Sequence, residues 1–335
     1  MNISELAEEL NLSPTTVSRA LSGQGEKYRV SRATVQRVLA AAEKHRVVPD
    51  ALGAGLQRGR MGMVGLLVPD ITNSFFSSLA RSIELELRSD GFSVQLCDSA
   101  EDPEVEVELI EQIVKRRLDG LILAPVGRLS DRFVEAMTAA PFPVVMVDRI
   151  LPELDLPLVS LDNAAAGRLA VKHLLDCGHR KIACLRGNRA SYTDRERYRG
   201  VEEVLLREGL PTGGPLVCGD GYTRQSGIEG ARKILGTVDL PEAVICLNGQ
   251  GILGILEVAS ELNLDIPGDI SVVAFDEQPW SALVSPPLTT IEQPVQEIAT
   301  RAVELMKDQQ GRGPGKSGHT VVEARIRIRE SVAHR

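Results

Sequence analysis

The sequence is poor in aromatic residues and has no long apolar run. Only 3% of its 335 residues are Phe, Trp or Tyr, whereas 43% are hydrophobic, so its cores must consist mainly of Leu, Val, Ile and Ala. No apolar run approaches the ~20 residues of a membrane span. The N-terminus has no basic segment followed by an apolar one. We therefore expect a cytoplasmic protein without membrane contact, and the length predicts two or three domains.

Paired cysteines and clustered histidines are also missing. The five cysteines are scattered without C-x-x-C spacing, and the five histidines form no group with the spacing of metal ligands. This pattern favours reduced, buried thiols over disulfides or a zinc site. No Ser, His and Asp arrangement indicates a catalytic nucleophile. We expect no metal, no cofactor and no catalytic residues.

Charge is unevenly distributed along the chain. The net charge is −8, but residues 1–60 hold 9 Lys and Arg against 6 Asp and Glu, a net charge of +3. The remaining residues carry a net charge of −11. A basic head on an acidic body favours contact with nucleic acid phosphates through the head alone.

The sequence pattern of residues 1–48 predicts three short helices. The first covers Ile3 to Leu10. The second follows Ser13, a favourable N-cap, and begins at Pro14, whose missing N–H costs nothing at the first helical position. Val17 and Leu21, four residues apart, are expected to face the core. The third helix is expected to begin at Ser31, with a buried stripe of Val35, Val38, Leu39 and Ala42.

The outward face of the second helix carries short polar residues and one arginine, namely Thr15, Thr16, Ser18 and Arg19. Hydroxyl groups can approach bases or phosphates closely, and an arginine can bridge O6 and N7 of guanine. A capped surface helix alone would have the same pattern. A tight turn joins this helix to the first one, however, and two short helices so joined, with base-reading side chains on the second, predict a helix-turn-helix DNA-binding head.

Residues 49–61 follow the head and have two interpretations. Pro49 ends the third helix, and the short segment after it is only marginally stable as an isolated helix. Gly53 and Gly55 each weaken that helix by about 1 kcal/mol relative to Ala. The segment is either a flexible linker or a hinge helix that forms only on DNA and against a second copy of the chain.

Residues 62–335 alternate apolar runs with helical patterns, which predicts an α/β fold with parallel sheets covered on both faces. The helical patterns begin near Ser74, Pro103 and Ser130. Two series of such units indicate two lobes, with a break near Leu161. The predicted strands are Val64–Val68, Val94–Cys97, Gly120–Ala124, Val144–Val147, Ile182–Leu185, Val244–Leu247 and Val272–Phe275.

Polar residues follow several of these strands, and ligands of open α/β sheets bind at the carboxyl ends of strands. A site between the lobes is therefore expected near Asp70, Asp148, Gly187, Asn248 and Asp276.

Side chains that suit a small ligand occur near these strand ends. Phe75 and Phe76 offer flat faces for a sugar or base ring, although they could equally be core residues. Arg197 offers a fork of donors for hydroxyl or acidic groups, or could form a surface ion pair. Tyr222 could form a wall of the pocket.

The segment Gly249–Gly254 matches G-x-G-x-x-G and suggests a different class of protein. It follows an apolar strand, opens a helix and precedes Asp276 by roughly twenty residues, as in dinucleotide-binding folds. An NAD-dependent enzyme is therefore an alternative, although no catalytic His, Cys or Lys pair lies nearby. A free-standing sugar-binding protein of the same two-lobed fold is another, against which the predicted head argues.

The order of motifs along the chain resembles the lac repressor family. The resemblance begins with I-x-x-[L/V]-A, T-T-V-S-R-A-L, V-S-x-x-T and P-x-A-x-x-x-x-L in the first 56 residues. It continues over nearly the full length in Gly65–Ile71, Asn73–Phe76, Asp148-Arg149, Gly178–Ala183, Ala274–Asp276, Pro287–Ile291 and Arg329–Ser331.

The resemblance implies a head (1–48), a hinge helix and linker (49–61) and a periplasmic-binding-protein-like core (62–335). Lobe one would comprise about 62–160 and 292–318, and lobe two about 161–291 and 319–335. The implied function is that of a homodimeric transcriptional regulator of the repressor type. It would bind a pseudo-palindromic DNA operator and a small effector, which is a sugar, a sugar derivative or a nucleoside.

The resemblance also implies roles for particular residues. Thr15, Thr16, Ser18 and Arg19 would read the major groove, and Leu56 would enter the minor groove and kink the DNA. The family positions that contact effector match Asp70, Phe76, Ser191, Thr193, Arg197, Tyr222, Asn248 and Asp276. We add Phe75 to these predicted effector contacts because of its flat apolar ring.

Three departures from the family pattern bear on these roles. The hinge has Gly53 and Ala54 where the family usually has Ala and often a basic residue, which predicts a soft hinge. The loop Gly23–Arg29 is about three residues longer than usual, and is either solvated or adds a phosphate contact through Lys27 and Arg29. Gly249 replaces a common acidic residue beside the effector, so the family's sugar contacts do not carry over directly.

Overall fold

The computed structural model describes residues 1–21, 23, 25–45, 61–116, 118–127, 129–309 and 318–335. They form two compact units, Met1–Met63 and Val64–Arg335, which are described separately. Most of the predicted hinge, including Gly53, Ala54 and Leu56, lies outside the described residues.

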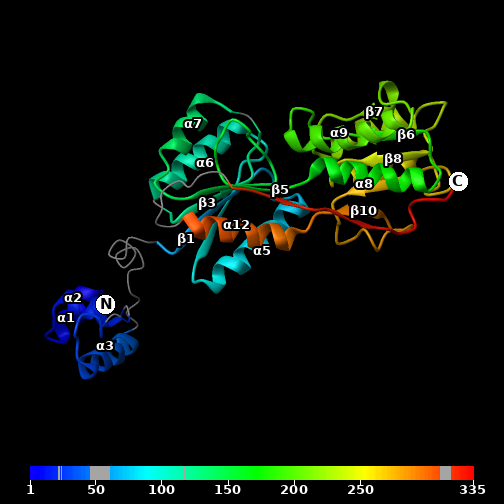
Figure 1. The fold of residues 1–335 in the computed structure, drawn as a ribbon. Coiled ribbons are helices and arrows are strands. Elements are labelled where there is room, and N and C mark those ends of the chain that lie inside the picture. The colour runs from blue at the N-terminus through cyan, green and yellow to red at the C-terminus, as the bar shows by residue number, and fades with distance from the viewer. Residues whose placement is uncertain (22, 24, 46–60, 117, 128, 310–317) are drawn as a thin grey trace. The chain divides into compact units, whose positions relative to one another are not determined.

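The described residues of the first unit form three helices, α1 (Ile3–Glu9), α2 (Pro14–Leu21) and α3 (Arg32–His45), as predicted (Figure 1). Helix α1 begins with a capping box, because the Asn2 side chain accepts the Glu5 N–H at 2.9 Å and the Glu5 carboxylate accepts the Asn2 N–H at 3.1 Å. Ser13 caps α2, since its Oγ accepts the Thr16 N–H at 3.1 Å.

One apolar cluster holds these three helices together. Leu6 of α1, Val17 of α2 and Val38 of α3 are completely buried in it, and Val35 packs against it. The expectation that Leu39 belongs to the buried stripe is wrong, because 48% of this residue is exposed. Residues 35, 38 and 42 define the inward face of α3, and position 39 lies about 100° further round the helix than 38.

The second unit contains two six-stranded sheets, one in each lobe (Figure 1). The strand order in lobe one is β11-β5-β4-β3-β1-β2, and in lobe two it is β12-β10-β9-β8-β6-β7. The registered pairs are parallel except β10–β12, which is antiparallel. This arrangement confirms the predicted α/β fold with parallel sheets.

The strands of lobe one are β1 (Met63–Val68), β2 (Ser93–Asp98), β3 (Gly120–Leu123), β4 (Val144–Val147), β5 (Leu158–Leu161) and β11 (His319–Val322). Those of lobe two are β6 (Ile182–Leu185), β7 (Val217–Cys218), β8 (Ala243–Cys246), β9 (Ser271–Phe275), β10 (Thr289–Glu292) and β12 (Arg325–Arg327). All seven predicted strands are present, with ends that differ by at most one residue.

Helices cover both faces of the lobe-one sheet. Helices α6 (Pro103–Arg116) and α7 (Asp131–Thr138) lie on one face, and α5 (Ser74–Ser89) and α12 (Val295–Gln309) on the other (Figure 1). In lobe two, α8 (Asn163–Asp176) packs against α9 (Tyr192–Arg207), and α10 (Arg224–Leu235) against α11 (Gly251–Glu261). A short 3-10 helix, Gly214–Leu216, precedes β7.

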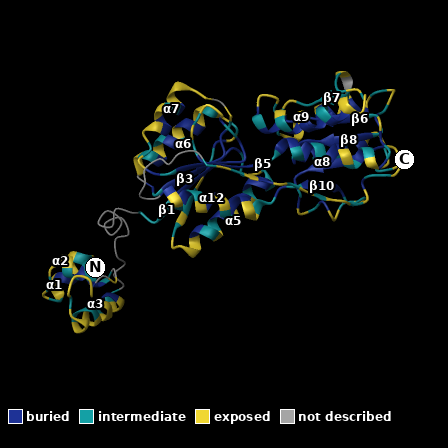
Figure 2. Ribbon diagram, in the orientation of Figure 1, coloured by how far each residue is buried: buried dark blue, intermediate teal, exposed yellow. Residues whose placement is uncertain are grey.

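The sheets form the interior of both lobes, and the exposed residues lie mainly on the outer faces of the helices and in loops (Figure 2). No helix among the described residues combines the length and apolarity needed to cross a bilayer. Within the same residues, no group of His, Cys, Asp and Glu has an arrangement that could hold a metal ion.

The chain passes between the lobes three times: after β5, after β10 and after β11. The boundary predicted at 318/319 is too early. Strand β11 pairs in parallel with β5, with His319 opposite Leu158, so residues 319–322 belong to lobe one. Glu292 ends β10 and Leu161 ends β5, so these two residues also lie in the lobe opposite to the one predicted. Such long-range pairing leaves no local signal in the sequence.

Glycines allow the helices of lobe two to approach closely. A Cβ atom on Gly200 of α9 would lie 2.0 Å from the carbonyl oxygen of Ala164 on α8. A Cβ atom on Gly167 of α8 would lie 2.0 Å from the carbonyl oxygen of Arg197 on α9. Only glycine fits at these positions without moving a backbone. This crossing therefore fixes the placement of Arg197.

Candidate functional site

The outward face of α2 carries the four residues that were predicted to read DNA. Thr15 is exposed, and Thr16, Ser18 and Arg19 are half-buried, whereas Val17 on the opposite side is completely buried. The Thr16 hydroxyl lies 2.8 Å from the Ser13 hydroxyl, so it also takes part in the helix cap. The geometry of the helix is that predicted, and base reading by these side chains stays a prediction.

A small cavity of about 30 Å³ lies at the carboxyl ends of strands from both lobes. Its lining residues are Asn73, Phe75, Phe76, Asp148, Arg149, Thr193, Arg197, Tyr222, Asn248, Gly249, Asp276 and Gln293. Seven of the nine residues proposed to contact effector are therefore brought together: Phe75, Phe76, Thr193, Arg197, Tyr222, Asn248 and Asp276.

The other two proposed residues, Asp70 and Ser191, do not line this cavity. The Asp70 carboxylate accepts the N–H of Thr72 at 2.8 Å and its hydroxyl at 2.6 Å, which makes Asp70 the start of a turn. Ser191 is buried behind Thr193, with the two hydroxyl oxygens 2.7 Å apart. Ser191 can thus orient Thr193 without reaching the cavity.

Arg149 also lines the cleft, although it was not among the predicted site residues. Its Nη1 and Nη2 donate to Glu101 at 2.8 and 2.5 Å. Its guanidinium lies 5.5 Å from the ring centre of Phe76 in lobe one and 5.0 Å from that of Tyr222 in lobe two. Burial alone would lower the pKa of Arg149, but the Glu101 carboxylate outweighs burial and raises it. The arginine therefore stays charged and links the two lobes through aromatic contacts.

Three residues that line the cleft each have a buried polar atom with no hydrogen-bond partner among the described residues: Asp148 Oδ1, Asn248 Nδ2 and Gln293 Oε1. Asn248 is oriented because its Oδ1 accepts the Gly251 N–H at 2.7 Å, which leaves the amide NH₂ directed elsewhere. Burial raises the pKa of Asp148 to about 6. A buried polar atom without a partner costs about 1–3 kcal/mol, so these atoms favour a bound group that both donates and accepts.

Arg197 and Asp276 are held rigidly beside these atoms. Arg197 donates from Nε to Asn163 Oδ1 and from Nη1 to the Leu247 carbonyl, both at 2.9 Å. Its burial, with only 5% of the residue exposed, contradicts the alternative of a surface ion pair. Asp276 accepts Nε2–H of Gln293 at 2.7 Å and the Gly249 N–H at 3.1 Å.

Phe75 and Phe76 were interpreted either as core residues or as flat faces for a ligand, and their positions fit both interpretations. Phe75 and Phe76 are buried members of the apolar core and also line the cavity, with ring centres 5.1 Å apart in an edge-to-face contact. Tyr222 lies directly over Gly187, where a Cβ atom would be 2.2 Å from its ring. Gly187 follows strand β6, as predicted, and its lack of a side chain leaves room for the Tyr222 ring in the cavity wall.

The glycines of Gly249–Gly254 have structural roles that do not involve a dinucleotide. The N–H groups of Gly249 and Gly251 donate to Asp276 and Asn248. A Cβ atom on Gly254 would lie 2.2 Å from the backbone of Gly227 on α10, so this glycine permits the contact of two helices. The N–H groups of both glycines are therefore engaged within the protein and are not open to a phosphate, which weakens the fingerprint interpretation.

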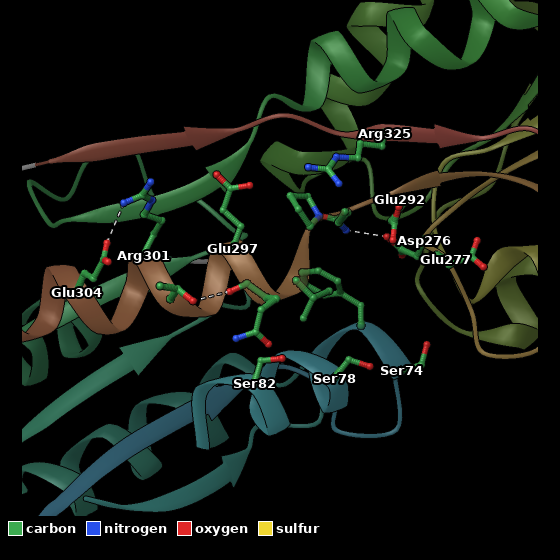
Figure 3. Close-up of a pocket in the computed structure, with 16 residues that line it drawn as sticks. Ser74, Ser78, Ser82, Asp276, Glu277, Glu292, Glu297, Arg301, Glu304 and Arg325 are labelled. Atoms are coloured by element: carbon green, nitrogen blue, oxygen red, sulfur yellow. Dashed lines mark hydrogen bonds and ion pairs between the residues drawn. The ribbon is translucent and has the colours of Figure 1, made fainter. Parts of the chain in front are cut away.

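A second, larger cavity of about 830 Å³ runs beside the cleft, between α5 and α12 (Figure 3). Ser74, Ser78 and Ser82 line it from α5, and Glu297 and Arg301 line it from α12. It shares a wall with the cleft, formed by Phe75, Asp276 and Gln293.

The two volumes show that the cleft is nearly closed. A cavity of about 30 Å³ holds one water, whereas sites for small ligands measure about 300–1,000 Å³. The larger cavity has the size of a ligand site, but most of the predicted residues and the unpartnered atoms of Asp148 and Asn248 lie at the smaller one alone. A ligand larger than a single water therefore needs the cleft to widen.

Comparison with known proteins matches both units. Residues 2–50 match the family model "Bacterial regulatory proteins, lacI family", and residues 171–332 match "Periplasmic binding protein-like domain". The HTH-type transcriptional repressor CytR of Escherichia coli (strain K12) is 32% identical over 328 residues, which cover 98% of this chain and 95% of that protein. The similarity thus extends from the head to the end of the core.

Solved structures agree with this result. A putative ribose operon repressor from Burkholderia thailandensis is 33% identical, with a TM-score of 0.71 over 79% of this chain and 98% of that one. The lac repressor dimer bound to operator and the anti-inducer ONPF has the same fold, with a TM-score of 0.86, 24% identity and 99% coverage of both chains. The chain belongs to the lacI family of bacterial regulatory proteins.

Proposed function

We propose that this chain is a homodimeric transcriptional repressor whose cleft binds a polyol, either a sugar or the ribose of a nucleoside. The observation that carries the polyol is the set of unpartnered buried atoms, namely the acceptors Asp148 Oδ1 and Gln293 Oε1 and the donor Asn248 Nδ2. A sugar hydroxyl both donates and accepts, so neighbouring hydroxyls can satisfy an acceptor and a donor at once. Arg197 and Asp276 add a fixed donor and a fixed acceptor in the same cavity.

The aromatic rings suit the apolar face of such a ligand. Phe76 and Tyr222 come from different lobes and flank the Arg149 guanidinium. A ring that enters between the lobes would meet these aromatic faces while its hydroxyls meet the polar groups. The family relative named as a putative ribose operon repressor supports a pentose as the first ligand to test.

The control of DNA binding follows from the closed cleft. A ligand must change the angle between the lobes in order to enter, and in a homodimer this change would alter the spacing of the two hinges. If hinge folding is coupled to DNA binding, a small change in spacing alters operator affinity. Two heads would then read half-sites about one helical turn apart.

The proposed DNA contacts remain those of the sequence analysis. Thr15, Thr16, Ser18 and Arg19 would read bases in the major groove, and Leu56 would enter the minor groove between the half-sites. Leu56→Ala should therefore weaken binding to operator DNA more than binding to nonspecific DNA. Equal losses on both DNAs would contradict the wedge role.

We test the cleft with a thermal-shift panel of free sugars, sugar phosphates and nucleosides, beginning with ribose. A ligand that binds only the folded state stabilises it by about 2.7 kcal/mol at 100 times its dissociation constant. Asn248→Ala should abolish the shift because it removes the unpartnered donor. Gln225→Ala, which removes an exposed amide that contacts Glu229 on α10, is the matched control and should keep the shift.

Two results would contradict the proposal. An Asn248→Ala variant with an undiminished shift would show that the ligand binds elsewhere, for example in the cavity between α5 and α12. We also propose that the chain has no catalytic function. Saturable quenching of its single tryptophan, Trp280, by NADH would contradict that part and restore the dinucleotide alternative.

A further inference from the structure

Arg19, in the last turn of α2, contacts the aromatic ring of Tyr28, which belongs to the loop Gly23–Arg29 after this helix. The Arg19 guanidinium carbon lies 4.0 Å from the centre of the Tyr28 ring. Lys27 Nζ lies 5.8 Å from the same ring centre. We propose that Tyr28 positions Arg19 for base reading, so that residues 25–30 form a specificity-determining part of the DNA interface. This inference rests on the proposed role of Arg19 as a base reader.

The loop has the rigidity that this role needs. Gly25 is buried against α3, where a Cβ atom would lie 2.7 Å from Val35 Cγ2. The Val30 N–H donates to the Gly25 carbonyl at 2.8 Å and closes the turn. The loop is thus fixed at both ends, and Tyr28 is held at a defined place beside α2.

Tyr28 contributes little to the core of the head. Its exposed fraction is 43%, and it belongs neither to the buried apolar cluster of the head nor to the residues packed against that cluster. Its aromatic contacts are with two cations, Arg19 and Lys27. A role in positioning those cations therefore accounts for the ring better than a role in packing.

The geometry of stacking leaves Arg19 able to read a base. A guanidinium stacks through its flat face, whereas it donates hydrogen bonds through its edge. The ring can therefore limit the rotamers of Arg19 while the edge still presents two N–H groups to O6 and N7 of a guanine. A long side chain that is already restrained loses less conformational entropy when it binds.

The charged residues of the loop also favour a position beside the DNA. The Glu26 carboxylate is bonded to Arg32 at 3.1 Å, so the acidic residue of the loop is paired within the head. Lys27 and Arg29 flank Tyr28 in the sequence and place positive charge next to the arginine. Phosphates beside the base that Arg19 reads would meet this charge.

The test uses the full chain and a DNA site selected by it from a randomised library. Binding of the selected site and of its single-base variants is then measured for wild type, Arg19→Ala, Tyr28→Leu, Tyr28→Phe and the double variant Arg19→Ala/Tyr28→Leu. A circular dichroism melt of each variant checks that the head is folded.

We expect Tyr28→Leu to relax discrimination at the base pair that Arg19→Ala also affects, by about two- to fivefold. Affinity for nonspecific DNA at the same salt concentration should stay unchanged. Tyr28→Phe keeps the ring and should keep the discrimination. The double variant should discriminate no less than Arg19→Ala alone, because the ring acts through the arginine.

Several results would overturn the inference. If Tyr28→Leu leaves discrimination unchanged while Arg19→Ala relaxes it, only the positioning role is refuted. Additive losses in the double variant, or equal losses in Tyr28→Phe and Tyr28→Leu, refute it as well. If Arg19→Ala itself leaves discrimination unchanged, the base-reading role fails together with the inference.

Discussion

The stability of the core should fall as pH rises through 7, because lobe one buries an acid. Glu106 lies in the first turn of α6 and is completely buried. Its Oε1 accepts the Val126 N–H at 2.7 Å, while its Oε2 has no partner among the described residues. Burial raises its pKa to about 7 from the ordinary value of 4.5, against the opposing effect of that hydrogen bond and of Arg149.

The sign and size of the effect follow from linkage. A carboxyl whose pKa is raised by folding binds its proton more tightly in the folded state. It therefore stabilises the fold fully below pH 4.5, and this contribution is lost as pH rises through 7. With these two pKa values, the contribution of Glu106 to the free energy of unfolding falls by about 2 kcal/mol between pH 5.5 and 8.

The substitution Glu106→Gln removes this titration and keeps an oxygen for the Val126 N–H. Urea unfolding followed by circular dichroism at pH 5.5 and pH 8 gives the free energy of unfolding at each pH. The decrease for wild type should exceed that for the variant by about 2 kcal/mol. The contribution of Asp148, which also has a raised pKa, is present in both proteins and cancels.

Glu108→Gln is the control, because Glu108 is exposed on the same helix. It should leave the pH dependence as in wild type. A Glu106→Gln variant with the same pH dependence as wild type would refute the reasoning, since Glu106 would then titrate alike in the folded and unfolded states.

Two further predictions concern packing and DNA. Gly200→Ala should lower the urea midpoint, because the overlap with the Ala164 carbonyl costs about 1–3 kcal/mol and outweighs the ~1 kcal/mol gain in helix propensity. Gly213→Ala, in extended backbone with nothing within 4 Å of its Cβ, should leave the midpoint unchanged, and equal midpoints for both variants would contradict the close crossing. Replacing Lys27 and Arg29 by Ala should reduce the slope of log K against log salt concentration by up to about 1.8 if both contact phosphates; an unchanged slope would leave the loop solvated.

The parts of the fold that were predictable are those with a local signal. The central strands β3, β4, β6, β8 and β9 are buried along their whole length and appear in the sequence as unbroken apolar runs. Strands β11 and β12 are partly exposed and short, and they contain His, Thr and Arg, so they lack the apolar run that marks the central strands. Their positions depend on pairing with β5 and β10, which lie far away in the sequence.

The site was predictable to a similar extent. Asp276 and Asn248 follow apolar strands directly, so the rule that ligands bind at strand ends finds them. Arg149 follows β4 just as closely, but its importance depends on Glu101, 48 residues earlier, and on Tyr222 in the other lobe. The contact of Tyr28 with Arg19 was likewise hidden, since it depends on how the loop folds back against α2.

The three passages of the chain between the lobes have a consequence for folding during synthesis. The sheet of lobe one is complete only when β11 is added, and that of lobe two only when β12 is added, both within the last 17 residues. Ser331, just beyond β12, donates to the Val272 carbonyl at 2.6 Å and accepts the Thr289 N–H at 2.8 Å, so the final segment also closes lobe two. The described helices α1, α2 and α3 of the head are neighbours in the sequence, so the head can fold before the lobes are made. Neither sheet can be completed before β11 and β12 have been made, so the two sides of the cleft should reach their final form late and together.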